Sequence, residues 1–491
     1  MNKSNIKKFK AKHYQIVIVI CFLVAYFLIQ LIGLRGFYSY GWDESVYLHM
    51  SNYFKSGGDG GFIENLRPIL FSIILIPFSH SIFISRLFIL VLSVFTLWIF
   101  YLIGKKNLNS EFSWVFPVVL AFFPFYYLSS NSILTEIVAL FFHALCVYYF
   151  FRKKYVFSGL LAMLAFFTRF QFGIYFPILL FGIFLIGTRK NISKNVSKFI
   201  LGILIGSPLF FINTYLFYSE TNSFFLATVY PLLNQLKDNF FEYLWYYKQG
   251  FFYYLKYLLN WSIFSMFAII GILFLIFFLV KSQFIKQESQ NKWLKRNLLL
   301  LVFLLIPFSY LLFSSHKEIR YLMLVIPWIV YFICFGLIET IKQVKNKLLE
   351  KNTILTFALV FIILIVFLGS FLLNSFLFIK DVYHAPKAFY DNYLFALQNL
   401  SHQNLVLTSF PMIKTYAKIE IGYYNDLYFY EMLSKGNYDY VYYTYNWFPC
   451  QENDIWCLNL REDTMNYLEN NFDLYTNYSL YGSDFFLYYK V

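Results

Sequence analysis

The chain has 491 residues, of which 59% are hydrophobic and only 13% are charged, and its mean hydropathy is positive. This composition excludes a soluble globular protein and indicates an integral membrane protein, in which many Phe and Tyr suit lipid-facing and interfacial positions. The formal net charge of +14 does not indicate a nucleic-acid partner, because the basic residues form short clusters between apolar runs, as in cytoplasmic loops.

The first apolar run, from Tyr14 to Leu34, follows the basic stretch KKFKAKH. Its length of about 20 residues, at roughly 1.5 Å per residue, matches a hydrocarbon core of about 30 Å. The run lacks the small residues of a signal-peptide cleavage site, so we interpret it as a retained anchor with a cytoplasmic N-terminus. The stretch YGWDESVYLHM (residues 40–50) then emerges on the outer side.

Residues 35–80 are predicted to form an outer loop, in which RPILFSIILIPF is too short to span and should lie along the interface. Ten further spans are predicted, at 81–104, 112–129, 132–151, 155–167, 172–187, 197–217, 261–280, 297–314, 321–340 and 353–379. The two short spans joined by TRFQ are expected to form a hairpin of half-length helices. The fold class is therefore an α-helical polytopic membrane protein with about 11 transmembrane helices.

Lys and Arg gather in the loops that this map places inside, as the positive-inside rule requires. The protein should be a multi-pass protein of the plasma membrane in a prokaryote, or of the endoplasmic reticulum membrane in a eukaryote. We expect a transmembrane domain at 1–380, including the outer loop 35–80, and an extracytoplasmic domain at 381–491.

The segment 381–491 has a different pattern from the spans. NLVLTS, YDYVYYTY and DFFLYYKV predict short strands, and EDTMNYLENN is compatible with a helix, so a small α/β domain is expected. Cys450 and Cys457 lie in one outer loop, PCQENDIWC, which favours a disulfide over two free thiols. Zinc is not expected, because no His or further Cys is spaced to complete a site.

Three places carry positive charge outside, next to membrane ends, where the positive-inside rule disfavours it. They are Arg67 in NLRPIL, Arg169 in FTRFQFG and the cluster SSHKEIRYLMLVIPW at 314–328. If residues 316–320 begin a helix, His316, Lys317 and Arg320 share one side and Glu318 is turned away. Such a face could hold a phosphate. The alternative is an interfacial loop whose long side chains reach water.

The acidic pair Asp43 and Glu44 also lies on the outer side. Neighbouring residues point in different directions in a helix and in a strand, so the two carboxylates cannot share one task. One could act as a general base while the other shapes the site, and the alternative is a pair of solvated loop acids. Glu136 and His143 share a helix face, but the position of Glu136 in a first helical turn is explained nearly as well by capping.

Several of these features together resemble the GT-C superfamily of membrane glycosyltransferases. They are the DE pair after the first span, an outer amphipathic segment with Pro, and a span opening with SRLFILVLSVFTLWIFYLIGKK. HKEIRYLMLVIPW resembles the H-K-E-x-R-[FY] signature of the mannosyltransferases that build lipid-linked oligosaccharides and GPI anchors. NSILTEIVALFF and LAFFTRFQFGIYFP are similar to early spans of that family, and the resemblance covers about residues 14–340.

The chain also departs from that pattern. The mannosyltransferases usually have His-Pro before the acidic pair, where this chain has Gly41 and Trp42. The outer loop and the terminal α/β domain are more similar to the protein O-mannosyltransferase and aminoarabinose-transferase branch. This leaves the acceptor and the sugar open.

The resemblance implies transfer of a hexose, mannose first, from a polyprenyl-phosphate or dolichyl-phosphate donor to a hydroxyl of a glycan, a lipid or a protein, with membrane lipid around it. A hydroxyl needs a carboxylate to take its proton, for which Asp43 is the candidate, with Glu44 as the second catalytic residue. The candidate donor-phosphate ligands are His316, Lys317, Arg320 and Arg67. The candidate substrate-binding residues are Arg169, Gln171, Glu136 and Glu318. No cofactor and no metal ligand is predicted, although one or two carboxylates could hold Mg²⁺ or Mn²⁺ with waters.

Two other functions compete with this interpretation. A polytopic lipid or glycolipid transporter would show ionisable residues at mid-membrane and internal repeats, whereas here the unexplained charges gather at outer span ends. A binding protein with a degenerate catalytic site is the second alternative. The enzyme hypothesis requires Asp43 and Arg320 to converge on one pocket at the outer leaflet.

Overall fold

The computed structural model divides the chain into two compact units, of which the first is Met1–Arg35 with Met50–Ile379 and the second is Gly36–His49 with Lys380–Val491. Helix α2 (Trp42–Ser56) begins in the second unit and ends in the first. The structure describes residues 3–36, 42–58, 63–64, 67–108, 112–187, 189–240, 250–259, 262–284, 288–314, 316–348, 361–377, 406–408, 421–423, 426–444, 455–480 and 483–490.

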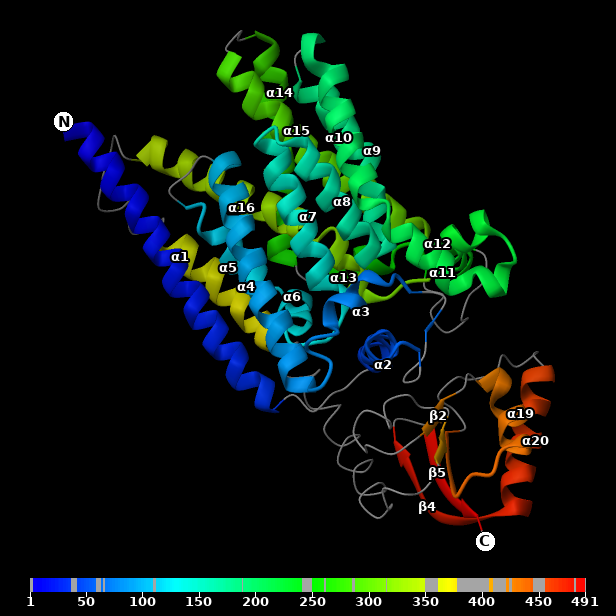
Figure 1. The fold of residues 1–491 in the computed structure, drawn as a ribbon. Helices are drawn as coiled ribbons and strands as arrows, with labels where there is room; N and C mark the ends of the chain where they lie inside the picture. Colours follow the sequence, from blue (N-terminus) through cyan, green and yellow to red (C-terminus); the bar gives the residue numbers. More distant parts are fainter. Residues whose placement is uncertain are drawn as a thin grey trace. The chain divides into compact units, whose positions relative to one another are not determined.

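The first unit is built of helices (Figure 1). Apart from α2 they are α1 (Lys3–Gly36), α3 (Leu70–Leu75), α4 (Ile82–Asn107), α5 (Val115–Ala121), α6 (Pro124–Ser129), α7 (Thr135–Phe151), α8 (Tyr155–Thr168), η1 (Phe170–Ile174), α9 (Tyr175–Ile186), η2 (Arg189–Asn191), α10 (Ile192–Gly206), α11 (Leu209–Thr221), α12 (Phe224–Phe240), α13 (Tyr253–Leu259), α14 (Ser262–Phe284), α15 (Glu288–Phe313), η4 (Ile319–Leu324) and α16 (Ile326–Leu348). A further apolar helix covers Phe361–Leu377.

Among the described residues, five helices are long and apolar enough to cross a membrane, namely α1, α4, α14, α15 and α16. Helices α10 and α11 together would form a sixth span, bent by 43°. The apolar helices α7, α8 and α12, and the run from η1 through α9, are shorter. The chain is therefore a multi-pass membrane protein, as predicted, while the predicted number of spans remains a prediction.

The predicted span 112–129 is broken into α5 and α6. The break falls at Phe122 and Phe123 because Pro124 occupies the first position of α6, where its missing N–H leaves no helical hydrogen bond unmade. The segment RPILFSIILIPF forms only the six-residue α3, whose Leu70 packs with α8 residues such as Met163 and Phe167.

Glycines allow two pairs of helices to approach closely. A Cβ on Gly202 of α10 would lie 2.1 Å from the carbonyl oxygen of Val156 in α8. Likewise, a Cβ on Gly336 of α16 would lie 2.1 Å from the carbonyl oxygen of Phe267 in α14. Such contacts suit membrane helices, whose association depends on close backbone packing because lipid offers no hydrophobic driving force.

The ends of several helices meet around η4, which contacts α6, α7, α15 and α16. Tyr175 at the start of α9 helps to hold this end of the unit: its hydroxyl donates to the main-chain oxygen of Leu324 at 2.6 Å and accepts from the indole of Trp328 at 3.1 Å. The conformation of η4 is therefore set by packing from several helices.

The second unit contains a five-stranded sheet with the order β2-β1-β3-β5-β4. Its elements are β1 (Val406–Thr408), β2 (Ile421–Tyr423), α19 (Asp426–Lys435), β3 (Tyr440–Thr444), α20 (Ile455–Asn471), β4 (Phe472–Leu480) and β5 (Ser483–Lys490). Strands β2, β1 and β3 are parallel, with Val406 of β1 opposite Ile421 of β2 and Tyr440 of β3. Strand β5 is antiparallel to both of its neighbours, β3 and β4, with Tyr489 of β5 opposite Tyr440 of β3.

Helices α19 and α20 lie on one face of this sheet (Figure 1). The hydrophobic core between these helices and the sheet contains Leu407, Phe429, Leu433, Val441, Tyr443, Leu468 and Tyr488. The predicted α/β character is confirmed, because NLVLTS contains β1, YDYVYYTY contains β3 and DFFLYYKV covers all of β5 except its first residue. Strands β2 and β4 were not predicted.

Candidate functional site

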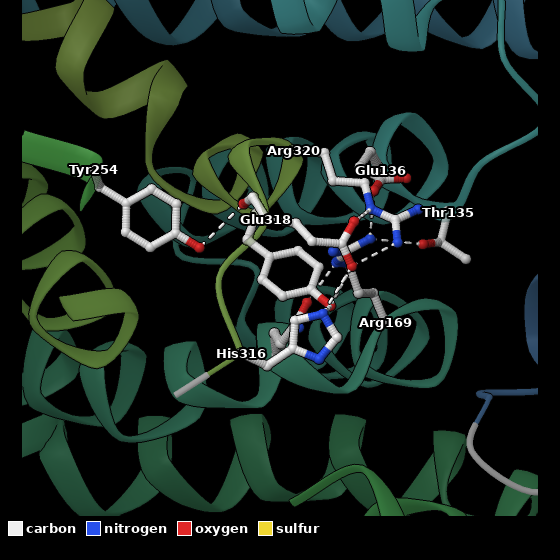
Figure 2. Close-up of polar contacts among 9 residues, drawn as sticks. Thr135, Glu136, Arg169, Tyr254, His316, Glu318 and Arg320 are labelled. Carbon is white, nitrogen blue, oxygen red and sulfur yellow. Dashed lines mark hydrogen bonds and ion pairs between the residues drawn. The ribbon is translucent and has the colours of Figure 1, made fainter. Parts of the chain in front are cut away.

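A polar cluster in the first unit brings together segments that are far apart in the sequence (Figure 2). It contains the start of α7, the link between α8 and η1, the segment before η4 and one residue of α13. Its polar contacts involve Thr135, Glu136, Arg169, Gln171, Tyr254, His316, Glu318, Arg320 and Tyr321.

Arg169 is the centre of one half of this cluster. The extended backbone of Arg169, with φ −156° and ψ 110°, ends α8 and directs the side chain toward α7. Its Nη1 donates to Thr135 Oγ1 at 3.0 Å and to Glu136 Oε1 at 2.6 Å, and its Nε donates to Gln171 Oε1 at 2.5 Å. The side chains of Glu136 and Arg169 are 1% and 11% exposed, so this is a buried ion pair.

Glu136 lies in the first turn of α7, as predicted, where the helix dipole favours an acid. The residue before the helix, Leu134, provides no side-chain cap, and the Oε2 atom of Glu136 has no hydrogen-bond partner in the described structure. Pairing with Arg169 is therefore the main stabilising contact of the Glu136 carboxylate. The sequence indicates both residues as candidates but does not indicate that they contact each other.

The predicted helix over residues 316–320 is wrong. The chain is extended at Glu318, with φ −117° and ψ 142°, and the 3₁₀ helix η4 begins only at Ile319. Side chains alternate in an extended segment, so His316 and Glu318 point to the same side and Lys317 points to the other. The expectation that Glu318 is turned away from its cationic neighbours is therefore wrong as well.

Glu318 instead lies between these cations. Its Oε1 contacts His316 Nε2 at 2.9 Å, accepts from Arg320 Nη2 at 2.9 Å and accepts from the Tyr321 hydroxyl at 3.1 Å. Its Oε2 lies 2.6 Å from Arg320 Nε as an ion pair. The guanidinium thus contacts both carboxylate oxygens, which is the arrangement that arginine also uses to bind phosphate.

Lys317 is not on this face. Its Nζ donates to the main-chain oxygen of Ser314 at 2.6 Å, just after α15, and the residue is 5% exposed. Burial lowers the pKa of its ammonium group, since the charged form is disfavoured away from water. Lys317 therefore closes the turn that follows α15, and its predicted role as a phosphate ligand remains untested.

Two tyrosines complete the cluster, and sequence analysis did not single them out. The Tyr321 ring lies 5.1 Å from Arg169 Cζ, and its hydroxyl contacts Glu318, so it touches both halves. Tyr254 of α13 donates to the main-chain oxygen of Glu318 at 3.0 Å. Burial, and then the charge of Glu318, raise the pKa of Tyr254. Tyr321 was visible within the H-K-E-x-R-[FY] signature, whereas no local pattern points to Tyr254.

The remaining predicted residues come from other segments of the chain. Arg67 forms an ion pair with Glu64, three residues earlier in the same segment. Asp43 and Glu44 occupy the first turn of α2 and belong to the second unit, so they are helical and not loop residues as expected. Glu44 is 3% exposed, which excludes a solvated acid at that position. The convergence of Asp43 with Arg320 remains a prediction.

His143 does not join Glu136 in the polar cluster. It packs among the rings of Phe172, Tyr175, Phe303 and Trp328, at centroid distances of 4.0 to 5.9 Å. Cys457 lies in α20 and not in a loop as expected, while Cys450 lies outside the described residues, so the predicted disulfide between them remains a prediction.

Metal binding was left open by the sequence. Within the described ranges, no group of three or more His, Cys, Asp and Glu side chains is placed to hold a metal ion. The cluster offers two sets of basic side chains, each paired with its own acid: His316 and Arg320 with Glu318, and Arg169 with Glu136. Since Arg320 is 29% exposed and Glu318 is 17% exposed, the first set is accessible to an anion from outside.

Comparisons with known proteins agree with this architecture. No protein-family model and no curated protein sequence matches the chain. Among solved structures, ArnT from Cupriavidus metallidurans bound to undecaprenyl phosphate matches 96% of this chain and 97% of its own length, with a TM-score of 0.60 and 11% identity. The archaeal oligosaccharyltransferase AglB from Archaeoglobus fulgidus, in complex with an inhibitory peptide and a dolichol-phosphate, matches 95% of this chain and 74% of its own, with a TM-score of 0.58 and 12% identity. The chain therefore shares the fold of these ArnT and AglB structures, and it has the polytopic helical architecture with a small sheet that its sequence predicts.

Proposed function

We propose that this chain is a membrane glycosyltransferase that takes its sugar from a polyprenyl-phosphate-linked donor. The observation that carries the proposal is the arrangement of Arg320 and His316, which together hold the carboxylate of Glu318 in a geometry suited to phosphate. Similar folds support it, because the ArnT and AglB structures were solved with undecaprenyl phosphate and dolichol-phosphate.

The chemistry follows from the donor. The acceptor oxygen attacks the anomeric carbon opposite the phosphate, the bond between that carbon and the phosphate oxygen breaks, and its electron pair stays on the phosphate. The leaving group therefore needs cations and no protonating acid, which is the role we assign to Arg320 and His316. The acceptor hydroxyl loses its proton to a carboxylate, which we assign to Asp43, and the anomeric centre is inverted.

The transferred sugar is proposed to be a hexose, with mannose as the first candidate, because HKEIRY matches the mannosyltransferase signature. The acceptor is proposed to be a hydroxyl on a lipid-linked glycan or on a protein, at the outer membrane face. The departure at Gly41 and Trp42 keeps aminoarabinose-type and protein O-mannosyl-type transfer as the alternatives to test.

The test uses the purified full chain in lipid nanodiscs with radiolabelled polyprenyl-phosphate mannose, glucose or aminoarabinose, and with protein or glycolipid acceptors. We expect label to move to an acceptor from one of these donors. Asp43→Asn should reduce the transfer rate by about 10²- to 10⁴-fold and leave donor binding nearly intact. Glu44→Gln is the matched control, since it changes the adjacent carboxylate in the same way. It should reduce the transfer rate less than Asp43→Asn does.

Three outcomes would contradict the proposal. Full activity of Asp43→Asn would exclude Asp43 as the base, and a larger loss in Glu44→Gln would exchange the two roles. Movement of intact donor across a liposome membrane, without transfer of sugar, would indicate a flippase instead.

A further inference from the structure

We propose that Glu318 is a built-in competitor for the lipid phosphate: its carboxylate occupies Arg320 and His316 until the donor arrives, and reclaims them to release the spent polyprenyl phosphate. This inference rests on the proposed function, because it assumes that these cations bind the phosphate. It adds a residue that controls how tightly substrate and product are held.

The first support is the geometry of the carboxylate. Both of its oxygens contact the Arg320 guanidinium, and one also contacts His316 Nε2 at 2.9 Å (Figure 2). A phosphate held by this edge of the guanidinium and by the same imidazole nitrogen would take the positions of the carboxylate oxygens. The two anions therefore cannot occupy that edge together, and binding of the phosphate there requires that the carboxylate leaves.

The second support is that this side chain can move while its backbone stays in place. The main-chain oxygen of Glu318 accepts from the Tyr254 hydroxyl at 3.0 Å and from the Tyr321 N–H at 3.0 Å. These bonds hold the backbone of residue 318 at the start of η4. The carboxylate is 17% exposed and lies at the end of a flexible side chain, so rotation about side-chain bonds is enough to free Arg320.

The third support is the change in charge during the reaction. The donor is a phosphodiester with one negative charge, whereas the product is a phosphomonoester whose second pKa is about 6, so it carries about −1.5 to −2 charge at pH 7. Breaking the sugar–oxygen bond leaves the electron pair on the phosphate and so strengthens its hold on the cations. A displaced carboxylate that stays tethered nearby repels the doubly charged product more than the singly charged donor.

Glu318 should therefore weaken binding of both lipids, and of the product more than the donor. Without it, the product would dissociate more slowly and inhibit the enzyme at lower concentration. The other acid of the cluster cannot take this role, because Glu136 is 1% exposed and is paired with Arg169.

The experiment measures binding of undecaprenyl phosphate, and of a non-reactive phosphodiester analogue of the donor, to the full chain in nanodiscs. Glu318→Gln keeps the shape of the side chain and removes its charge. We expect this variant to bind undecaprenyl phosphate about 2- to 5-fold more tightly than the unmodified protein, with a smaller gain for the phosphodiester. Product inhibition should increase by the same factor.

Glu136→Gln is the matched control, because it removes one negative charge from the same cluster but leaves Glu318 in place. It should not tighten the binding of undecaprenyl phosphate. Glu318→Thr provides a second neutral variant if the glutamine variant does not fold. Glu318→Asp keeps the charge on a side chain that is one methylene shorter, so it should bind undecaprenyl phosphate less tightly than the neutral variants do.

Equal or weaker binding of undecaprenyl phosphate by the neutral Glu318 variants would overturn the inference and indicate that Glu318 only positions its neighbours. The proposed function would survive that result, provided that the unmodified protein binds the lipid and transfers sugar. Failure of the unmodified protein to bind any lipid phosphate would overturn both.

Discussion

Two arginine–glutamate pairs lie in one cluster of this protein, and they differ mainly in their exposure to water. Arg169 and Glu136 are separated by 2.6 Å and are 11% and 1% exposed; Arg320 and Glu318 are also separated by 2.6 Å but are 29% and 17% exposed. Separating the first pair leaves a charge in a medium of low dielectric constant, whereas water can solvate the separated charges of the second. The same chemistry therefore serves as a fixed structural link in one place and as an exchangeable contact in the other.

The backbone around each pair adds to this difference. Glu136 is fixed in the first turn of α7, a helix of 17 residues, and its partner is also bonded to Thr135 and Gln171. Glu318 instead follows an extended segment between α15 and η4. A rigid support suits a residue that holds a substrate site together, and a short link suits one that must release its partner.

The largest expected effect is therefore the loss of stability when the buried pair is broken. Glu136→Ala should lower the free energy of unfolding by about 3–5 kcal/mol, because it leaves the Arg169 guanidinium buried without a counter-charge. Glu318→Ala should lower it by about 1 kcal/mol or less, since its partner is open to water. Denaturant unfolding in detergent, followed by tryptophan fluorescence, measures both values.

The control for this comparison is Glu136→Gln, which keeps an acceptor for Arg169. Its free energy of unfolding should lie between those of the two alanine variants. Equal losses in Glu136→Ala and Glu318→Ala would show that burial does not distinguish the pairs. The contrast between a fixed and an exchangeable ion pair would then have to be given up.

The second effect concerns lipid-phosphate affinity. Arg320→Ala should weaken binding of undecaprenyl phosphate by about 10- to 100-fold, the loss of a hydrogen bond to a charged group, with little change in unfolding free energy. Arg169→Ala should instead reduce stability, because it leaves Glu136 buried and unpaired. Titration of the lipid into nanodiscs, beside the unfolding assay, separates these outcomes, and an unchanged affinity in Arg320→Ala would exclude it as a phosphate ligand.

The sequence predicted the members of this cluster better than their contacts. His316, Arg320 and Arg169 stood out because positive charges at outer span ends oppose the positive-inside rule, which requires no knowledge of the fold. The pairing of Arg169 with Glu136, 33 residues apart, depends on how α7 and α8 pack, and no local pattern encodes it.

The error at residues 316–320 has a similar origin. An apolar run follows Arg320, so a helix starting at His316 was the natural expectation. The structure delays the regular helix to Ile326, because η4 is held by hydrogen bonds from residues such as Tyr175 and Tyr254, which are distant in the sequence. Tertiary contacts of this kind override local propensity, and they turned a predicted cationic helix face into an extended segment around Glu318.

The membrane spans and the strands were also predicted only where the local sequence pattern is strong. Hydropathy located the apolar segments, since it depends on composition alone, but not the break before Pro124 or the bend between α10 and α11. In the second unit, β1, β3 and β5 carry apolar runs, whereas the three-residue β2 and the polar-rich β4 do not and were missed.

The smallest expected effect concerns Tyr321, which touches both ion pairs with different parts of its side chain. The hydroxyl contacts Glu318 Oε1 at 3.1 Å, and the ring lies 5.1 Å from Arg169 Cζ. Tyr321→Phe removes the hydroxyl's contacts with Glu318 and His316 and keeps the ring. It should weaken the binding of the Glu318 carboxylate to its partners by about 0.5 kcal/mol and tighten undecaprenyl phosphate binding by about 2-fold. Tyr321→Leu removes the ring as well and should add a loss of about 0.5–1 kcal/mol in unfolding free energy. If the phenylalanine variant changes stability and leaves affinity unaltered, then the exposed pair is a structural link like the buried one.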